Sequence, residues 1–361
     1  MKFFCKAAMK TPTSRYMPQM DSLRGLAVTA VLVQHSFGNR VPIGTWAVAL
    51  FFVISGYLIS RSIFSLRDAG MRLPQAALHF FTRRTLRLFP AYYLTVILGA
   101  LLFEKMRPDW LWYAGYATNF LIDFRQTLVP LTPTWSLAIE EQFYVGWFLL
   151  LMLMASKKLG ALTIFLIVLA PVARYILIAG GDPFGTYLPW TNCDALAVGA
   201  LLCLRERKGI DKAFLSARIT VFLLLASVFC ALTALKWDPL FGPFGALVSL
   251  AISLASAFLV SMARHGFAGT LGGFLEWRPL VYIGKISYGI YLYDMLTSEI
   301  ARLLFSSTPF FWRLAAEGTA IGFVSHCAIT VAFAAMSFRF FEMPLRRLFD
   351  HRTRSVAAAG S

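Results

Sequence analysis

Stretches of about 20 mostly apolar residues recur along the whole chain, separated by shorter polar segments. Because a helix rises about 1.5 Å per residue, a run of this length is enough to cross the hydrocarbon core of a bilayer. The pattern therefore predicts an all-α integral membrane protein with about ten transmembrane helices. The ten windows lie near residues 22–39, 45–63, 87–104, 135–155, 159–179, 191–205, 218–236, 243–263, 279–301 and 318–341, and the sixth of them is short.

The basic residues are distributed unevenly between the two sides that these windows define. With the N-terminus inside, 26 of the 34 Lys and Arg residues fall on the inner side and seven on the outer side, while Arg174 lies within the fifth window. Because Lys and Arg concentrate in cytoplasmic loops, we expect both termini in the cytoplasm. The chain then divides into a cytoplasmic N-terminal segment (1–20), a membrane domain (21–345) and a basic cytoplasmic tail (346–361).

Composition excludes an ordinary soluble enzyme. Hydrophobic residues make up 58% of the chain and charged residues 14%, whereas soluble domains carry roughly 25% charged residues. The net charge of +16 follows the predicted membrane sidedness, so we expect lipid and not nucleic acid as its partner. The five cysteines mostly fall in apolar segments without metal-like spacing, which indicates neither a metal site nor a disulfide framework.

The first window carries two ionisable side chains, Arg24 and His35. Eleven residues separate them, a little over three turns, so both lie on one helix face about 16 Å apart. Arg24 alone could equally well lie at the lipid headgroups. Ionisable groups within a span are costly and are functional candidates, and the pair on one face favours a functional role.

A basic cluster precedes the third window, where Arg83, Arg84 and Arg87 lie in the sequence RRTLR. Arg84 and Arg87 are three residues apart, so they share a helix face and can both donate to phosphate oxygens. Taken alone, such a cluster is better explained by cytoplasmic anchoring of the helix.

Two adjacent carboxylates, Glu140 and Glu141, lie about 8 Å inside the fourth window, too deep for a well-solvated pair. His35 lies at a similar predicted depth below the outer face. A carboxylate that orients an imidazole lets that imidazole act as a general base.

Depth thus separates an inner basic layer from an outer layer of His and Glu. A ligand with an anionic head and a long neutral arm would fit between them. Coenzyme A has this shape, and its extended pantetheine arm reaches about 14 Å, close to the rise between the two charged groups of the first window. The inner layer comprises Arg24, Arg84 and Arg87, and the outer layer comprises His35, Glu140 and Glu141.

Seven motifs in a fixed order resemble the acyltransferase-3 family of bacterial membrane proteins, which transfer acyl groups, usually acetyl, to glycans and some small molecules. The resemblance covers nearly the whole chain. The motifs are MDSLRGLAVTAVLVQHSF, FFVISGYLIS, RRTLRLFPAYYL, WSLAIEEQFY, CDALAVGALL, ISYGIYLY and FRFFEMPLRRL.

The resemblance implies roles for individual residues. The family's required Arg and His on the first span match Arg24 and His35. Its inner Arg-x-x-Arg motif matches Arg84 and Arg87, which implies contacts to the phosphates of an acyl-CoA donor. The family also implies a location in the bacterial inner membrane.

The carboxylate motif of the family makes Glu141 the stronger functional candidate, with Glu140 as the other. The chain departs from the family where Tyr293 and Asp294 follow the ISYGIYL stretch, because relatives often have His there. We therefore assign no catalytic role to Asp294. Many relatives also carry a fused extracytoplasmic esterase domain, which we do not expect after Glu342. Transfer then ends in the membrane domain or is passed to a separate periplasmic protein.

The sequence therefore predicts a membrane O-acyltransferase that uses acetyl-CoA as donor substrate and binds no permanent cofactor. His35 would act as general base, oriented by Glu140 or Glu141, and a covalent acyl-histidine remains an alternative. The acceptor would be a hydroxyl of a carbohydrate or glycolipid, such as exopolysaccharide or O-antigen. The alternatives are a cytoplasmic small molecule or lipid-linked sugar, or, from another class, transport of an anionic substrate.

Overall fold

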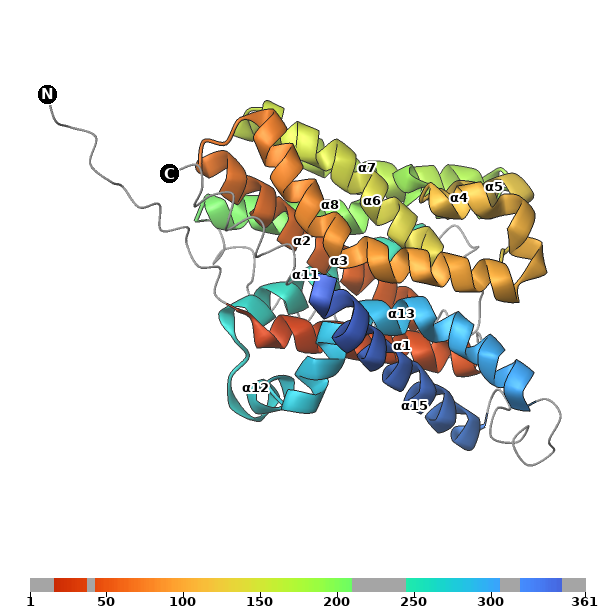
Figure 1. Cartoon of the computed structure of the whole chain (residues 1–361). Helices are drawn as coiled ribbons and strands as arrows, with labels where there is room; N and C mark the ends of the chain where they lie inside the picture. The colour runs from red at the N-terminus through yellow and green to blue at the C-terminus, as the bar shows by residue number, and fades with distance from the viewer. Residues whose placement is uncertain (1–15, 38–42, 210–244, 306–318, 346–361) are drawn as a thin grey trace, which may run out of the picture.

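The computed structural model describes residues 16–37, 43–209, 245–305 and 319–345. Within these ranges every regular element is helical (Figure 1). The long helices are α1 (Pro18–Phe37), α2 (Gly44–Asp68), α3 (Leu73–Leu102), α6 (Thr134–Leu153), α7 (Ser156–Ala179), α8 (Cys193–Arg207), α11 (Gly245–His265), α13 (Arg278–Phe305) and α15 (Ala320–Ser337). Short helices are η2 (Glu104–Asp109), α4 (Trp110–Ala114), α5 (Thr118–Arg125), η3 (Phe184–Tyr187), η4 (Pro189–Thr191), α12 (Gly269–Leu275) and η5 (Phe338–Glu342).

Among the described residues, six helical segments are long and apolar enough to cross a membrane, namely α2, α3, α6, α7, α11 and the continuous stretch 320–345. Nine of the ten predicted windows coincide with helices: six with these segments and three with α1, α8 and α13. The remaining window, near 218–236, lies outside the described residues, as do most of the predicted N-terminal segment and the tail. The all-helical membrane class is confirmed, and the ten-span topology stays a prediction.

Helix α1 lies against α13 and α2 near the middle of the bundle (Figure 1). Its N-terminal end is held by hydrogen bonds to the segment around α12. The Gln19 amide donates to Phe267 O (3.2 Å) and Glu276 Oε1 (3.0 Å), and Ser22 Oγ donates to Leu275 O (2.5 Å). These bonds anchor the N-terminal end of α1 to the segment that leads into α13.

The relative directions of packed helices agree with alternating crossings. Helices α1 and α13 run parallel, since Asp21 lies beside Gly284 and His35 contacts Asp294. Helices α3 and α6 run antiparallel, because Phe80 stacks on Phe148 with ring centroids 5.2 Å apart, whereas Arg84 contacts Glu141. In the predicted topology α1 and α13 share a direction and α3 and α6 oppose each other.

The long helix α3 corrects one predicted boundary. It begins at Leu73 and not near residue 87, so Arg84 lies about 16 Å inside the helix and not at its mouth. The apolar window missed this part because the first turns carry polar side chains, which favour helix but not hydrocarbon. Pro74 near its start fits a helix N-terminus, where a missing N–H costs nothing.

Helices α2 and α8 approach so closely that only glycine fits at two positions. A Cβ added at Gly56 would overlap the carbonyl of Leu196, and one at Gly199 would overlap the carbonyl of Val53. At both positions a small residue lets the two helix backbones meet.

Gly199→Ala should lower the stability of the protein by about 1–3 kcal/mol, because the added methyl group forces α2 and α8 apart. The measurement is the thermal unfolding midpoint in detergent. Gly146→Ala is the matched control, since a Cβ at Gly146 has no atom within 4 Å and alanine favours helix. Equal midpoints for the two variants would contradict the close α2–α8 contact.

Candidate active site

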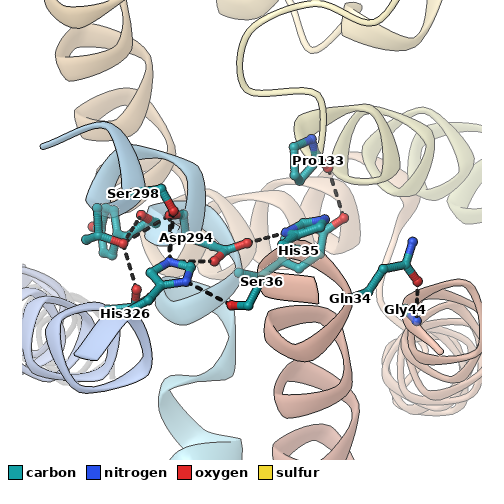
Figure 2. A network of polar contacts seen from close by, with 12 residues as sticks. Gln34, His35, Ser36, Gly44, Pro133, Asp294, Ser298 and His326 are labelled. Carbon is teal, nitrogen blue, oxygen red and sulfur yellow. Dashed lines mark hydrogen bonds and ion pairs between the residues drawn. The ribbon is translucent and has the colours of Figure 1, made fainter. Parts of the chain in front are cut away.

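The last turn of α1 brings His35 onto a carboxylate of α13. His35 Nδ1 contacts Asp294 Oδ2, and Asp294 is only 1% exposed whereas the imidazole is 31% exposed (Figure 2). A carboxylate accepts hydrogen bonds and cannot donate, so the proton of a neutral His35 lies on Nδ1. This leaves Nε2 unprotonated, which is the state a general base requires.

The second oxygen of the same carboxylate contacts another histidine, His326 of α15. His326 Nε2 lies 3.0 Å from Asp294 Oδ1 and 3.0 Å from Ser298 Oγ. Its other nitrogen, Nδ1, lies 3.3 Å from Ser36 Oγ, the residue next to His35 (Figure 2). Asp294 is thus held between two imidazoles, and the three side chains come from three helices.

The structure contradicts the expectation that Glu140 or Glu141 orients His35. Both carboxylates instead face Arg84: Glu141 Oε1 accepts a 2.9 Å bond from Arg84 Nε, and Glu140 Oε2 lies 3.8 Å from Nη2. The Arg84 guanidinium also lies over the ring of Tyr144, 3.5 Å from its centroid. Because α3 begins earlier than expected, Arg84 lies level with the glutamates, and the two predicted layers are not separate there.

Arg84→Met should lower the stability of the protein by about 3–5 kcal/mol. The carboxylates of Glu140 and Glu141 are little exposed, and the substitution removes the cation that pairs with them. Thermal unfolding in detergent measures this loss. Arg83→Met is the control, since Arg83 is exposed and lies one residue away on the same helix. If both variants unfold at the same temperature, the arginine–glutamate cluster does not stabilise the α3–α6 contact.

The remaining predicted cationic residues lie apart from His35. Arg24 is half-buried on α1, about 16 Å along the helix from His35, and is not part of the cavity beside it. Arg83 and Arg87 are exposed on α3. The structure thus brings together Arg84, Glu140 and Glu141 in one cluster, and it separates all three from the His35–Asp294 contact.

A cavity of about 630 Å³ opens beside His35, within the range of pockets that bind small molecules. It is bounded by the C-terminal parts of α1 and α7, the N-terminal parts of α2, α8 and α11, and the residues that precede α6, while Tyr291 and Met295 line it from within α13. Tyr187 of η3 lies on its wall, and burial raises the pKa of this phenol, which stays neutral. In the predicted topology all these helix ends are on the outer side.

Sequence reasoning missed Asp294 because it compared this position with the family pattern and found the wrong residue type. A physical signal was present nonetheless. An aspartate in the middle of an apolar window is costly and needs a partner. Depth also pointed to one, since Asp294 lies about 24 Å along α13 and His35 about 26 Å along α1, and the two helices run parallel.

Residues 17–339 match the sequence profile of the family described as "Acyltransferase domain", acyltransferase-3. The chain therefore belongs to the acyltransferase-3 family, as the motifs indicated.

Three proteins of known sequence show the same relationship over almost the whole chain. YrhL of Bacillus subtilis is 29% identical over 96% of this chain. The peptidoglycan O-acetyltransferase OatA of Listeria monocytogenes is 29% identical over 92%, and the O-acetyltransferase OatA of Staphylococcus aureus 28% identical over 95%. The alignments cover 58%, 56% and 59% of these relatives, so the chain spans less than two thirds of their length. No solved structure matches the chain.

Proposed function

We propose that this protein is an O-acetyltransferase of the bacterial cytoplasmic membrane that moves an acetyl group from acetyl-CoA to a hydroxyl of an envelope glycan. The single observation that carries the proposal is the contact between His35 and Asp294 at the edge of a cavity, within an acyltransferase-family membrane domain. The names of all three relatives support acetyl transfer, and two of them specify peptidoglycan.

In the proposed reaction His35 Nε2 removes the proton from the acceptor hydroxyl as its oxygen attacks the thioester carbonyl. The new C–O bond forms, the C–S bond breaks, and the proton passes from His35 to the departing thiolate. The products are the acetyl ester and free coenzyme A. Asp294 holds the ring by Nδ1 and stabilises the imidazolium that forms, as the carboxylate of a catalytic triad does.

His326 is proposed as a positioning residue. It touches Asp294 Oδ1 while His35 touches Oδ2, so the carboxylate cannot rotate away from His35 without losing the second contact. A buried aspartate is costly unless it is paired, and the ion-pair contact with His326 adds to the contact with His35.

The donor is proposed to approach from the cytoplasmic side and to meet Arg83 and Arg87, which are exposed on α3 on either side of Arg84. Guanidinium groups bind phosphate oxygens well because each presents several N–H donors in a plane. Arg24 lies about 16 Å from His35 along α1, toward the predicted cytoplasmic end, which suits a residue that lines the path of the pantetheine arm. The Arg84 guanidinium already faces Glu140 and Glu141, so Arg84 is proposed to position these carboxylates and not to bind the donor phosphates.

The acceptor is proposed to enter from the outer side, because the cavity beside His35 is bounded by the helix ends predicted to lie there. This favours an envelope glycan over a cytoplasmic small molecule. A separate periplasmic partner would be needed only if the acetylated product were passed on.

The test is release of free thiol from acetyl-CoA by purified protein in nanodiscs, with and without a peptidoglycan-derived glycan. We expect release to require both the glycan and the enzyme. A burst of thiol without glycan would indicate an acetyl-His35 intermediate, which is consistent with the same donor. Uptake of an anionic substrate into proteoliposomes without any thiol release would contradict the proposal and favour a transporter.

A further inference from the structure

A buried ion pair on the cavity wall has no part in the reaction described above. Arg174 of α7 contacts Asp194 of α8, and the two residues are 8% and 1% exposed. Both line the cavity that also contains His35. Among the described residues, Arg174 Nε has no hydrogen-bond partner although the atom is buried.

Simple helix packing is a poor explanation for this pair. The desolvation of two charges offsets most of their attraction, and apolar residues of similar size often hold helices together equally well. The pair also leaves a buried guanidinium donor unused, which costs free energy unless a ligand accepts from it. Its position on a cavity wall, and not inside a close-packed core, supplies room for such a ligand.

Two aromatic side chains line the same cavity. Trp135 and Tyr187 meet edge to face, with ring centroids 5.0 Å apart and an interplanar angle of 90°. The combination of aromatic rings with a carboxylate and a guanidinium suits a pyranose. Sugar hydroxyls both donate and accept hydrogen bonds, and the apolar C–H face of the ring packs on an aromatic surface.

We propose that Arg174 and Asp194, together with Trp135 and Tyr187, bind a neutral sugar unit of the acceptor glycan. This rests on the proposed function and names the acceptor subsite within it. Asp194 accepts from the sugar hydroxyls and the Arg174 guanidinium donates to one of them. The paired charges favour a neutral sugar over a carboxylate, because an anion would have to compete with Asp194 for the guanidinium. Since His35 lies on the same cavity, the bound sugar can present a hydroxyl to Nε2.

The experiment measures binding of N,N′-diacetylchitobiose, a neutral disaccharide, by saturation-transfer NMR to the protein in nanodiscs. The variant carries Arg174→Met and Asp194→Leu together, so that no unpaired charge is left and packing is kept. The control carries Arg264→Met and Glu206→Leu, which removes a half-buried 2.9 Å ion pair about 18 Å further along α8. Thermal unfolding and acetyl-CoA binding are recorded for all three proteins.

We expect the wild type and the control to bind N,N′-diacetylchitobiose alike, and the Arg174/Asp194 variant to bind it at least tenfold more weakly with unchanged acetyl-CoA binding. Equal sugar affinity in wild type and variant would overturn the inference, as would no sugar binding by the wild type. A different result would contradict the proposed function alone: the sugar binds through the Arg174–Asp194 pair, but acetyl-CoA is never consumed.

Discussion

His35→Ala should lower the rate constant of glycan-dependent acetyl transfer by about a hundred- to ten-thousandfold, the range that a positioned general base contributes. The affinity for acetyl-CoA should change little, because the basic residues proposed to hold it lie elsewhere on α1 and α3. The variant should also fold, since Asp294 keeps His326 as a partner. The measurement is the initial rate of thiol release against acetyl-CoA and glycan concentration.

His265→Ala is the matched control for this loss. His265 is exposed in the last turn of α11, where its ring bonds to the backbone of its own helix, so its removal should leave the rate within about twofold. A His35→Ala enzyme as fast as this control would remove His35 from the chemistry.

Asp294→Asn should give the second largest loss, about a hundredfold or more in the same rate constant. The amide is almost the same size, but it is neutral and no longer stabilises an imidazolium at His35. It can also present its NH₂ group to Nδ1, which would favour the tautomer with the proton on Nε2 and leave no base. The loss should appear in the rate constant and not in the Michaelis constant for acetyl-CoA.

Glu141→Gln separates this account from the one that the sequence suggested. Glu141 contacts Arg84 and not His35, so the substitution should mainly lower the unfolding temperature. Its effect on the rate constant should be smaller than that of Asp294→Asn. A larger kinetic loss in Glu141→Gln would restore the glutamate as the partner of the catalytic step.

The apolar pattern predicted the helices well because crossing a bilayer imposes a length and a composition on each span. It failed at the start of α3, where polar turns continue the helix beyond the apolar window. Helical spacing likewise placed Arg24 and His35 on one helix face. Such patterns contain information about a single helix and its depth.

The partner of His35 could not be found in the same way, because Asp294 is 259 residues away in the sequence. Their contact depends on how closely α1 and α13 pack, and that depends on Gly25 and Gly284, where an added Cβ would meet the opposing backbone. The glutamate pair was assigned to His35 by depth alone. The antiparallel packing of α3 on α6 places both glutamates against Arg84 instead.

The most direct measurement is the transfer of label from [¹³C]acetyl-CoA to the glycan, followed by mass spectrometry of the glycan before and after mild alkali, for wild type and His35→Ala. We predict that the wild type adds a labelled acetyl group that mild alkali removes as acetate, which is the behaviour of an O-ester, and that His35→Ala adds almost none. A glycan that gains no label from the wild type, or gains it equally from both proteins, would contradict acetyl transfer through His35.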